Sequence, residues 1–184
     1  MRLYEFELER VSWASLREST GSATAIPGVL TQLLTASTPE ECETHYWRLE
    51  NYVVVQGNLF EVAEFVVPVL LAALQESSPR CVRISILELL FQIVSGGPHQ
   101  SELALGNFDL ARRCQAKTRE GIWILYRELM QDHNSGARDV LEVVETDQAR
   151  LAHYMALIGP ENIDYAQLIR QAPAGGRISK PEKE

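Results

Sequence analysis

Histidines and a cluster of glutamates are the residues of this chain that come closest to a chemical motif. The four histidines stand far apart, and none has a second histidine or a cysteine at the spacing of a metal site: His45, His99, His133 and His153. Glu40, Glu41 and Glu43 follow Thr38-Pro39, where carboxylates stabilise the start of a helix without any catalytic role. There is no glycine-rich phosphate loop and no nucleophile elbow. We therefore expect no enzyme activity, no metal and no cofactor.

The segment from Tyr52 to Phe60 instead has the composition of a protein-binding site. It places aromatic and hydrogen-bonding side chains around a glycine, a combination typical of binding hot spots. Two acids follow at a spacing of three residues, so they share one helix face and could meet a basic partner. A solvated helix edge would explain them equally well. The candidate partner-binding residues here are Tyr52, Gln56, Asn58, Phe60, Glu61 and Glu64.

Internal repetition indicates what kind of fold must position these residues. Residues 26–34 and 67–74 align when Pro27 is placed on Pro68, at an offset of 41 residues. HEAT and armadillo units recur at about 40–47 residues, and each unit is a pair of antiparallel helices. The offset therefore favours a helical-repeat fold.

A second pair of similar segments reveals an insertion. Residues 81–90 resemble residues 136–144 at an offset of 55, and the excess of 14 equals the length of the segment 95–108. Gly96-Gly97-Pro98 and Gly106-Asn107 give this segment the composition of a loop. Insertions into a regular repeat often carry function, although a neutral surface loop is an equal alternative. Its candidate partner-binding residues are His99, Glu102 and Asn107.

Helical periodicity continues through most of the chain, so we predict an all-α, HEAT-like α-solenoid of about four helix pairs. The alternation of apolar and acidic residues over 4–9 is strand-like, and it predicts an extended arm or a frayed helix start. Residues 1–171 form a single domain, and residues 172–184 form a disordered tail without an apolar face. The predicted helices are 12–19, 23–36, 39–55, 59–75, 79–94, 109–131, 137–146 and 148–158, closed by a short helix over 163–171.

The chain resembles a group of small bacterial HEAT-repeat proteins over most of residues 11–145. The resemblance rests on Trp13-Ala14-Ser15-Leu16, Gly21-Ser22-Ala23, Ile26-Pro27 and above all Tyr46-Trp47-Arg48-Leu49-Glu50-Asn51-Tyr52-Val53-Val54-Val55-Gln56-Gly57. It implies an α-solenoid with a binding face. Some members of the group look like immunity proteins, which bind and neutralise a toxin encoded beside them.

Charge and composition limit the possible partners and compartments. Residues 1–108 carry 13 acidic against 6 basic residues, whereas residues 109–184 carry 12 against 11. An acidic half repels nucleic-acid phosphates and attracts basic proteins, although acidity for solubility alone is an open alternative. No apolar stretch is long enough for a membrane span, the first residues do not resemble a secretory signal, and the three scattered cysteines predict buried thiols. We expect a cytoplasmic protein that binds neither membranes nor nucleic acid directly.

These observations favour a protein-binding role. Our specific hypothesis is an immunity protein that neutralises a basic toxin domain, such as a nuclease, by occlusion or by plugging its active site with the loop 96–107. One alternative is an adaptor or scaffold without a toxin. Another is an enzyme on a helical-repeat scaffold, such as a DNA-base glycosylase, which would need a basic groove. A local basic run does exist, and we interpret it as a charged helix face: Arg112, Arg113, Lys117 and Arg119.

Overall fold

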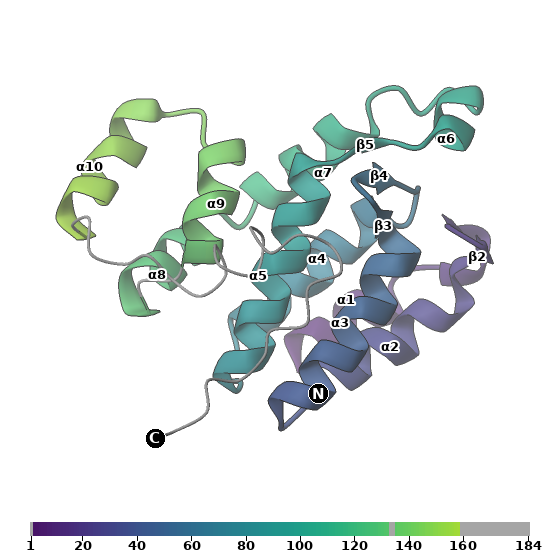
Figure 1. Cartoon of the computed structure of the whole chain (residues 1–184), viewed down its shortest axis with the longest axis horizontal. Helices are drawn as coiled ribbons and strands as arrows, with labels where there is room; N and C mark the ends of the chain where they lie inside the picture. The colour runs from purple at the N-terminus through teal and green to yellow at the C-terminus, as the bar shows by residue number, and fades with distance from the viewer. Residues whose placement is uncertain (1, 133–134, 159–184) are drawn as a thin grey trace, which may run out of the picture.

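The computed structural model describes residues 2–132 and 135–158, with the side chains of residues 132 and 135 left out (Figure 1). This part of the chain is mostly helical, which confirms the all-α prediction. The predicted helix over 163–171 and the predicted tail lie outside the described residues. The helices are α1 (Leu3–Glu9), α2 (Ile26–Leu34), α3 (Pro39–Val53), α4 (Ala63–Leu74), α5 (Arg80–Ser95), α6 (Gln100–Ala104), α7 (Leu110–Arg119), α8 (Ile122–Asp132), α9 (Ser135–Val144) and α10 (Gln148–Ile158), with 3-10 turns η1 (Trp13–Ser15) and η2 (Ala23–Ala25).

Short strands lie between the helices. β1 (Arg17–Glu18) pairs with β2 (Gly21–Ser22) in an antiparallel hairpin. β3 (Val54–Val55) and β4 (Asn58–Leu59) form a second hairpin, and β5 (Gly97–Pro98) joins β4 in parallel. The second sheet therefore ties the segment 95–108 to the connection between α3 and α4.

Local sequence explains where the principal helices start. Thr38 caps α3, because its hydroxyl accepts a hydrogen bond of 3.2 Å from the backbone N–H of Glu41. Pro39 occupies the first turn, where its missing N–H costs nothing, and Glu40 and Glu41 complement the helix dipole. The start predicted at Pro39 is confirmed, and α5 starts at Arg80, one residue after the predicted position.

The helices pack in two rows, and α4 lies at the centre of one of them. α4 packs against α1 and α7, while α5 packs against α3 and α9, and the rows meet between α4 and α5. Most residues of α4 are buried, including Val66, Val67, Leu70 and Leu74 with no exposed surface. Burying each such side chain contributes roughly 1.5–3 kcal/mol, so α4 is a main source of stability.

The N-terminal region differs from the prediction. Residues 3–9 form the helix α1, which excludes the extended arm and agrees with the helical alternative, because Tyr4 packs into the core and α1 lies along α4. The predicted helix over 12–19 is instead the turn η1 followed by the β1–β2 hairpin. Gly21 has a φ of +151°, which a helix cannot accommodate.

The predicted helix over 109–131 is divided into α7 and α8 at Glu120-Gly121. A Cβ atom on Gly121 would lie 2.6 Å from the Leu71 side chain of α4. The glycine thus allows the α7–α8 turn to approach α4 closely. The helix therefore ends at Arg119, and a new helix begins at Ile122, where the backbone contacts α4.

The inserted segment 95–108 is not an irregular loop throughout. It contains β5 and the helix α6, followed by a turn at Gly106 with a φ of +86°. Figure 1 shows α6 at one end of the long axis of the molecule and α10 at the other.

Candidate protein-binding site

The candidate residues meet where the β3–β4 hairpin, the start of α4 and the inserted segment come together. The hairpin turns at Gln56-Gly57, both of which have positive φ, at +51° and +78°. Two such residues form the tight turn that matches the twist of the flanking strands. Asn58 donates a side-chain hydrogen bond of 3.1 Å to the Val55 carbonyl, which closes the turn.

The inserted segment is attached to this hairpin by its backbone. The N–H of Gly97 donates to the Gly57 carbonyl at 2.9 Å, and the N–H of His99 donates to the Leu59 carbonyl at 2.9 Å. A Cβ atom on Gly96 would lie 3.0 Å from both the Gly57 carbonyl oxygen and the Leu59 side chain. A larger residue at position 96 would therefore push the segment away from the hairpin.

His99 connects the strand β5 to the helix α6. Its ring lies over the buried Phe60 ring, with centroids 4.9 Å apart. Its Nδ1 accepts a hydrogen bond of 3.2 Å from the N–H of Ser101 and so caps α6. Both contacts fix the direction in which α6 leaves the sheet.

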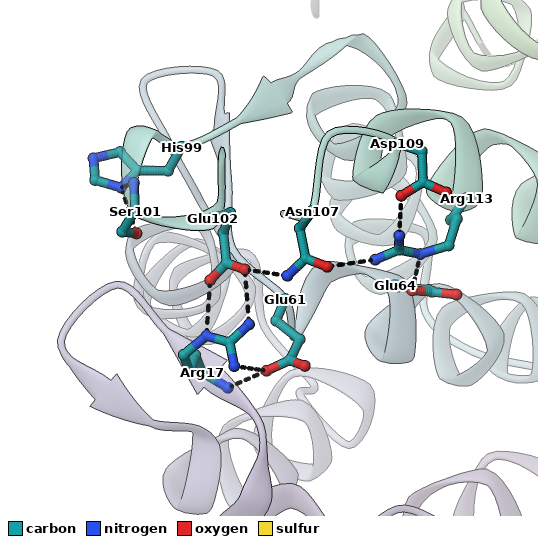
Figure 2. A network of polar contacts seen from close by, with 9 residues as sticks. All are labelled: Arg17, Glu61, Glu64, His99, Ser101, Glu102, Asn107, Asp109 and Arg113. Atoms are coloured by element: carbon teal, nitrogen blue, oxygen red, sulfur yellow. Dashed lines mark hydrogen bonds and ion pairs between the residues drawn. The ribbon is translucent and has the colours of Figure 1, made fainter. Parts of the chain in front are cut away.

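Figure 2 shows the network that holds α6 against the β1 strand. Arg17 donates to the two carboxylate oxygens of Glu102 at 3.2 and 2.9 Å, and it forms a second ion pair with Glu61 at 3.0 Å. Asn107 donates to Glu102 at 2.6 Å. The Glu102 side chain is 1% exposed. Burial alone would raise its pKa, but the hydrogen bonds from Arg17 and Asn107 outweigh burial and hold the pKa of Glu102 below its ordinary value.

Asn107 links this cluster to a second one on α4 and α7. Its side-chain oxygen accepts a hydrogen bond of 3.4 Å from Arg113. Arg113 also pairs with Glu64 at 2.7 Å and with Asp109 one helical turn earlier. The resulting chain of contacts runs from β1 through α6 to α7, as the dashed lines in Figure 2 show.

Beyond the network, the inserted segment exposes apolar side chains to solvent. Leu103 is 36% exposed, Leu105 61% and Phe108 72%. We name these three residues the apolar tip. The network beneath it contains four carboxylates and two guanidinium groups, so the local charge is −2. The site is thus an apolar surface set in acidic surroundings.

The structure gives the predicted site residues different environments. Phe60 and Glu102 are buried, so their side chains contact the protein interior, and Tyr52 is half-buried against the core. Gln56 and Asn58 are exposed at the hairpin turn. The network brings together Glu61, Glu64 and Asn107 with Glu102, whereas His99, just before α6, contacts Ser101 and Phe60 beside the network.

Sequence reasoning missed the basic members of the network and the apolar tip. Arg17 lay in a segment predicted as helix, which concealed its position beside Glu102. The spacing of Asp109 and Arg113 on α7 was a visible signal for an ion pair. Phe108 was placed at the boundary of the insertion and not considered as a contact residue.

Comparison of the chain with protein-family models, curated proteins and solved structures finds no match. Within the described residues, no group of three or more His, Cys, Asp or Glu side chains is arranged to hold a metal ion. In the same part of the chain, none of the helices combines the length and apolarity needed to cross a bilayer.

Proposed function

We propose that this chain is a protein-binding helical-repeat protein, and that the apolar tip is the centre of its binding surface. The specific form of the proposal is an immunity protein that holds a basic toxin domain and occludes its active site. In this proposal the chain and its partner meet in the cytoplasm, and the chain needs neither catalysis nor a cofactor to act.

The observation that carries the proposal is an exposed apolar surface on a segment that the fold holds in place. Phe108 and Leu105 are the most exposed large apolar side chains of the segment. They contribute nothing to the core, yet β5 pairing and the Arg17–Glu102 contact fix the segment that carries them. A preorganised apolar patch lowers the entropic cost of association, which favours a role in recognition.

Charge supports the nature of the partner. The four acids of the network exceed its two arginines, and the whole N-terminal part of the chain is acidic. A basic surface on the partner would be attracted to this end of the molecule at a distance, and apolar contact at the tip would then hold the complex.

The HEAT-like form of the array is supported by the repeat offset and by the packing of the rows. α4 contacts α7 and α5 contacts α9, as expected when successive helix pairs stack. A concave or edge surface formed by such stacking is the usual binding surface of helical repeats.

The basic run on α7 argues against the glycosylase alternative. Arg113 is paired with Glu64 and Asp109, Lys117 with Glu120, and Arg119 with the Val144 carbonyl. Two of the four cations, Arg113 and Lys117, are thus neutralised within the chain, which weakens the run as a nucleic-acid groove. The charges on α7 do not argue against the adaptor alternative. Only the experiment below distinguishes an adaptor from an immunity protein.

The test is co-production with the polypeptide encoded by the reading frame beside this chain's gene. The chain should restore growth to cells that make this polypeptide. The purified pair should associate more slowly at 1 M than at 0.1 M salt, since the Debye length falls from about 10 to about 3 Å. Replacing Leu105 with Ser should weaken binding about tenfold or more, as loss of a hot-spot contact does. Leu157→Ser is the matched control, because Leu157 is 62% exposed on α10 at the opposite end.

If Leu105→Ser and Leu157→Ser bind equally well, the apolar tip is not the binding surface. If the adjacent polypeptide is harmless to cells but still binds through the tip, the adaptor function replaces the immunity function.

A further inference from the structure

A hollow of about 440 Å³ lies at the other end of α4 from the protein-binding site. It is lined by the α4–α5 connection, by the start of α5 and by α8, including Glu76, Ser78, Arg80, Arg83 and Arg127. Its volume is within the range of about 300–1,000 Å³ that small-molecule sites occupy. α4 has 12 residues, so the hollow and the network are separated by roughly 16 Å along the helix.

A buried acid orients two of the three arginines. Glu128 has no exposed surface, and both Arg83 and Arg127 form ion pairs with it. Arg127 also donates to the Leu74 carbonyl at 2.6 Å. These contacts hold the Arg127 guanidinium in one orientation before any ligand arrives, which reduces the entropy lost on binding.

Two hydrogen-bonding atoms at the hollow have no partner. The Nε of Arg127 and the Oγ of Ser78 are both buried and unsatisfied. A buried polar atom without a partner costs free energy, so such atoms are rare, and a water molecule or an anion can supply the partner. The two buried atoms are hydrogen-bond donors with almost no accessible surface, so an oxyanion in the hollow reaches them only when the surrounding side chains shift slightly, and it would then satisfy both.

The remaining lining also favours an anion. Arg80 is exposed and begins α5, which has no side-chain cap and no acid in its first turn. Glu76 is engaged elsewhere, because it accepts a hydrogen bond from the N–H of Leu3 at 2.7 Å and lies 3.8 Å from Arg2. Three arginines therefore face two carboxylates, each of which already has a cationic partner.

We propose that this hollow binds the phosphate group of a small phosphorylated molecule of sugar-phosphate size. Arginine forks match the geometry of phosphate oxygens, and the buried donors of Arg127 and Ser78 supply the directional contacts. The volume of about 440 Å³ is larger than a phosphate group alone fills. The site is independent of the protein-binding surface, and its test involves different residues.

The experiment titrates the full chain with inorganic phosphate, ribose 5-phosphate and ribose, at constant ionic strength, and follows backbone amide resonances. Both phosphates should shift the amides of residues 78–83 in a saturable way, and ribose should not. Arg80→Gln should weaken ribose 5-phosphate binding about tenfold or more, and Ser78→Ala about two- to tenfold, as loss of a charged or neutral hydrogen bond does. Neither position has a structural partner to lose.

Arg112→Gln is the matched control, since Arg112 is an exposed arginine on α7 outside the hollow. It should leave binding unchanged. The proposal is overturned if phosphates up to about 10 mM give no saturable shifts, a concentration at which even millimolar sites fill. It is also overturned if Arg112→Gln weakens binding as much as Arg80→Gln, because binding would then reflect surface charge alone.

Discussion

Replacing Arg17 with Met tests how strongly the ion network supports the inserted segment. Methionine preserves most of the length and apolar volume of the side chain and removes the guanidinium. Glu102 would lose both of its bonds to Arg17 and keep the one from Asn107 and a backbone hydrogen bond at Glu61. Its carboxylate, 1% exposed, would then be a poorly compensated buried charge.

The expected loss of stability follows from the exposure of the two partners. Breaking a fully buried ion pair by removing one member costs about 3–5 kcal/mol, and exposed pairs contribute about 0–1 kcal/mol. Glu102 is buried but the Arg17 side chain is 42% exposed, so water can partly replace it. We therefore expect the free energy of unfolding to fall by about 2 kcal/mol at pH 7, between these limits.

The pH dependence has a definite sign. The pKa of Glu102 is lowered in the folded chain, so its ion pair stabilises fully above the unfolded pKa of about 4.3 and is lost as pH falls through the folded pKa. In the Arg17→Met variant, burial should instead raise the pKa of Glu102, and protonation relieves the penalty. The deficit of the variant should thus be largest near pH 7, begin to shrink above about pH 4.3 as the raised pKa of the variant is crossed, and go on shrinking until the lowered pKa of the intact chain is crossed.

Urea unfolding at several pH values, followed by circular dichroism, measures this difference. Arg10→Met is the control, since Arg10 is 54% exposed and its pair with Glu7 is on the surface. The control should change stability by about 0.5 kcal/mol or less. Adding Glu102→Gln to Arg17→Met should recover part of the loss. A deficit equal to that of Arg10→Met, or one that does not change with pH, would refute the view that Glu102 depends on Arg17.

Two further predictions concern the core. Burial raises the pKa of Cys42 and Cys114 to about 12 each, whereas Cys81 is only half-buried. An aromatic disulfide reagent at pH 8 should therefore modify Cys81 quickly, and Cys42 and Cys114 only after urea is added. Three equal rates would contradict this expectation. Gly121→Ala should destabilise the chain by about 1–3 kcal/mol, because the new methyl group overlaps the Leu71 side chain. In a double-mutant cycle, adding Leu71→Ala should relieve part of this loss. Additive effects of the two substitutions would show that residues 121 and 71 do not touch.

The sequence predicted those helices whose stability depends on a continuous apolar face. Periodicity placed α3 and α5 within a few residues of their observed bounds, because capping and first-turn residues are local signals. It did not decide between an extended arm and a helix at α1, whose sequence alternates like a strand. There, packing of Tyr4 against the core outweighs the local pattern.

The candidate site was only partly predictable, for a related reason. The sequence placed Glu61, Glu64, Glu102 and Asn107 near a functional region, but it assigned them to a partner. Arg17 lies 85 residues from Glu102 in the chain, and no local signal connects residues at such a distance. The ion pairs are therefore visible only once the rows of helices are assembled.

Ion pairs hold the segment 95–108 because its helix α6 is too short to be held by apolar packing. A helix within the rows buries an apolar face against two neighbours, whereas α6 has five residues and its buried side chain is Glu102. With so little apolar surface to bury, α6 gains its position from directional bonds to Arg17 and from backbone pairing through β5. This arrangement leaves Leu105 and Phe108 mostly exposed to solvent. The segment can therefore present apolar side chains to solvent without weakening the core, as the binding surface that we propose would require.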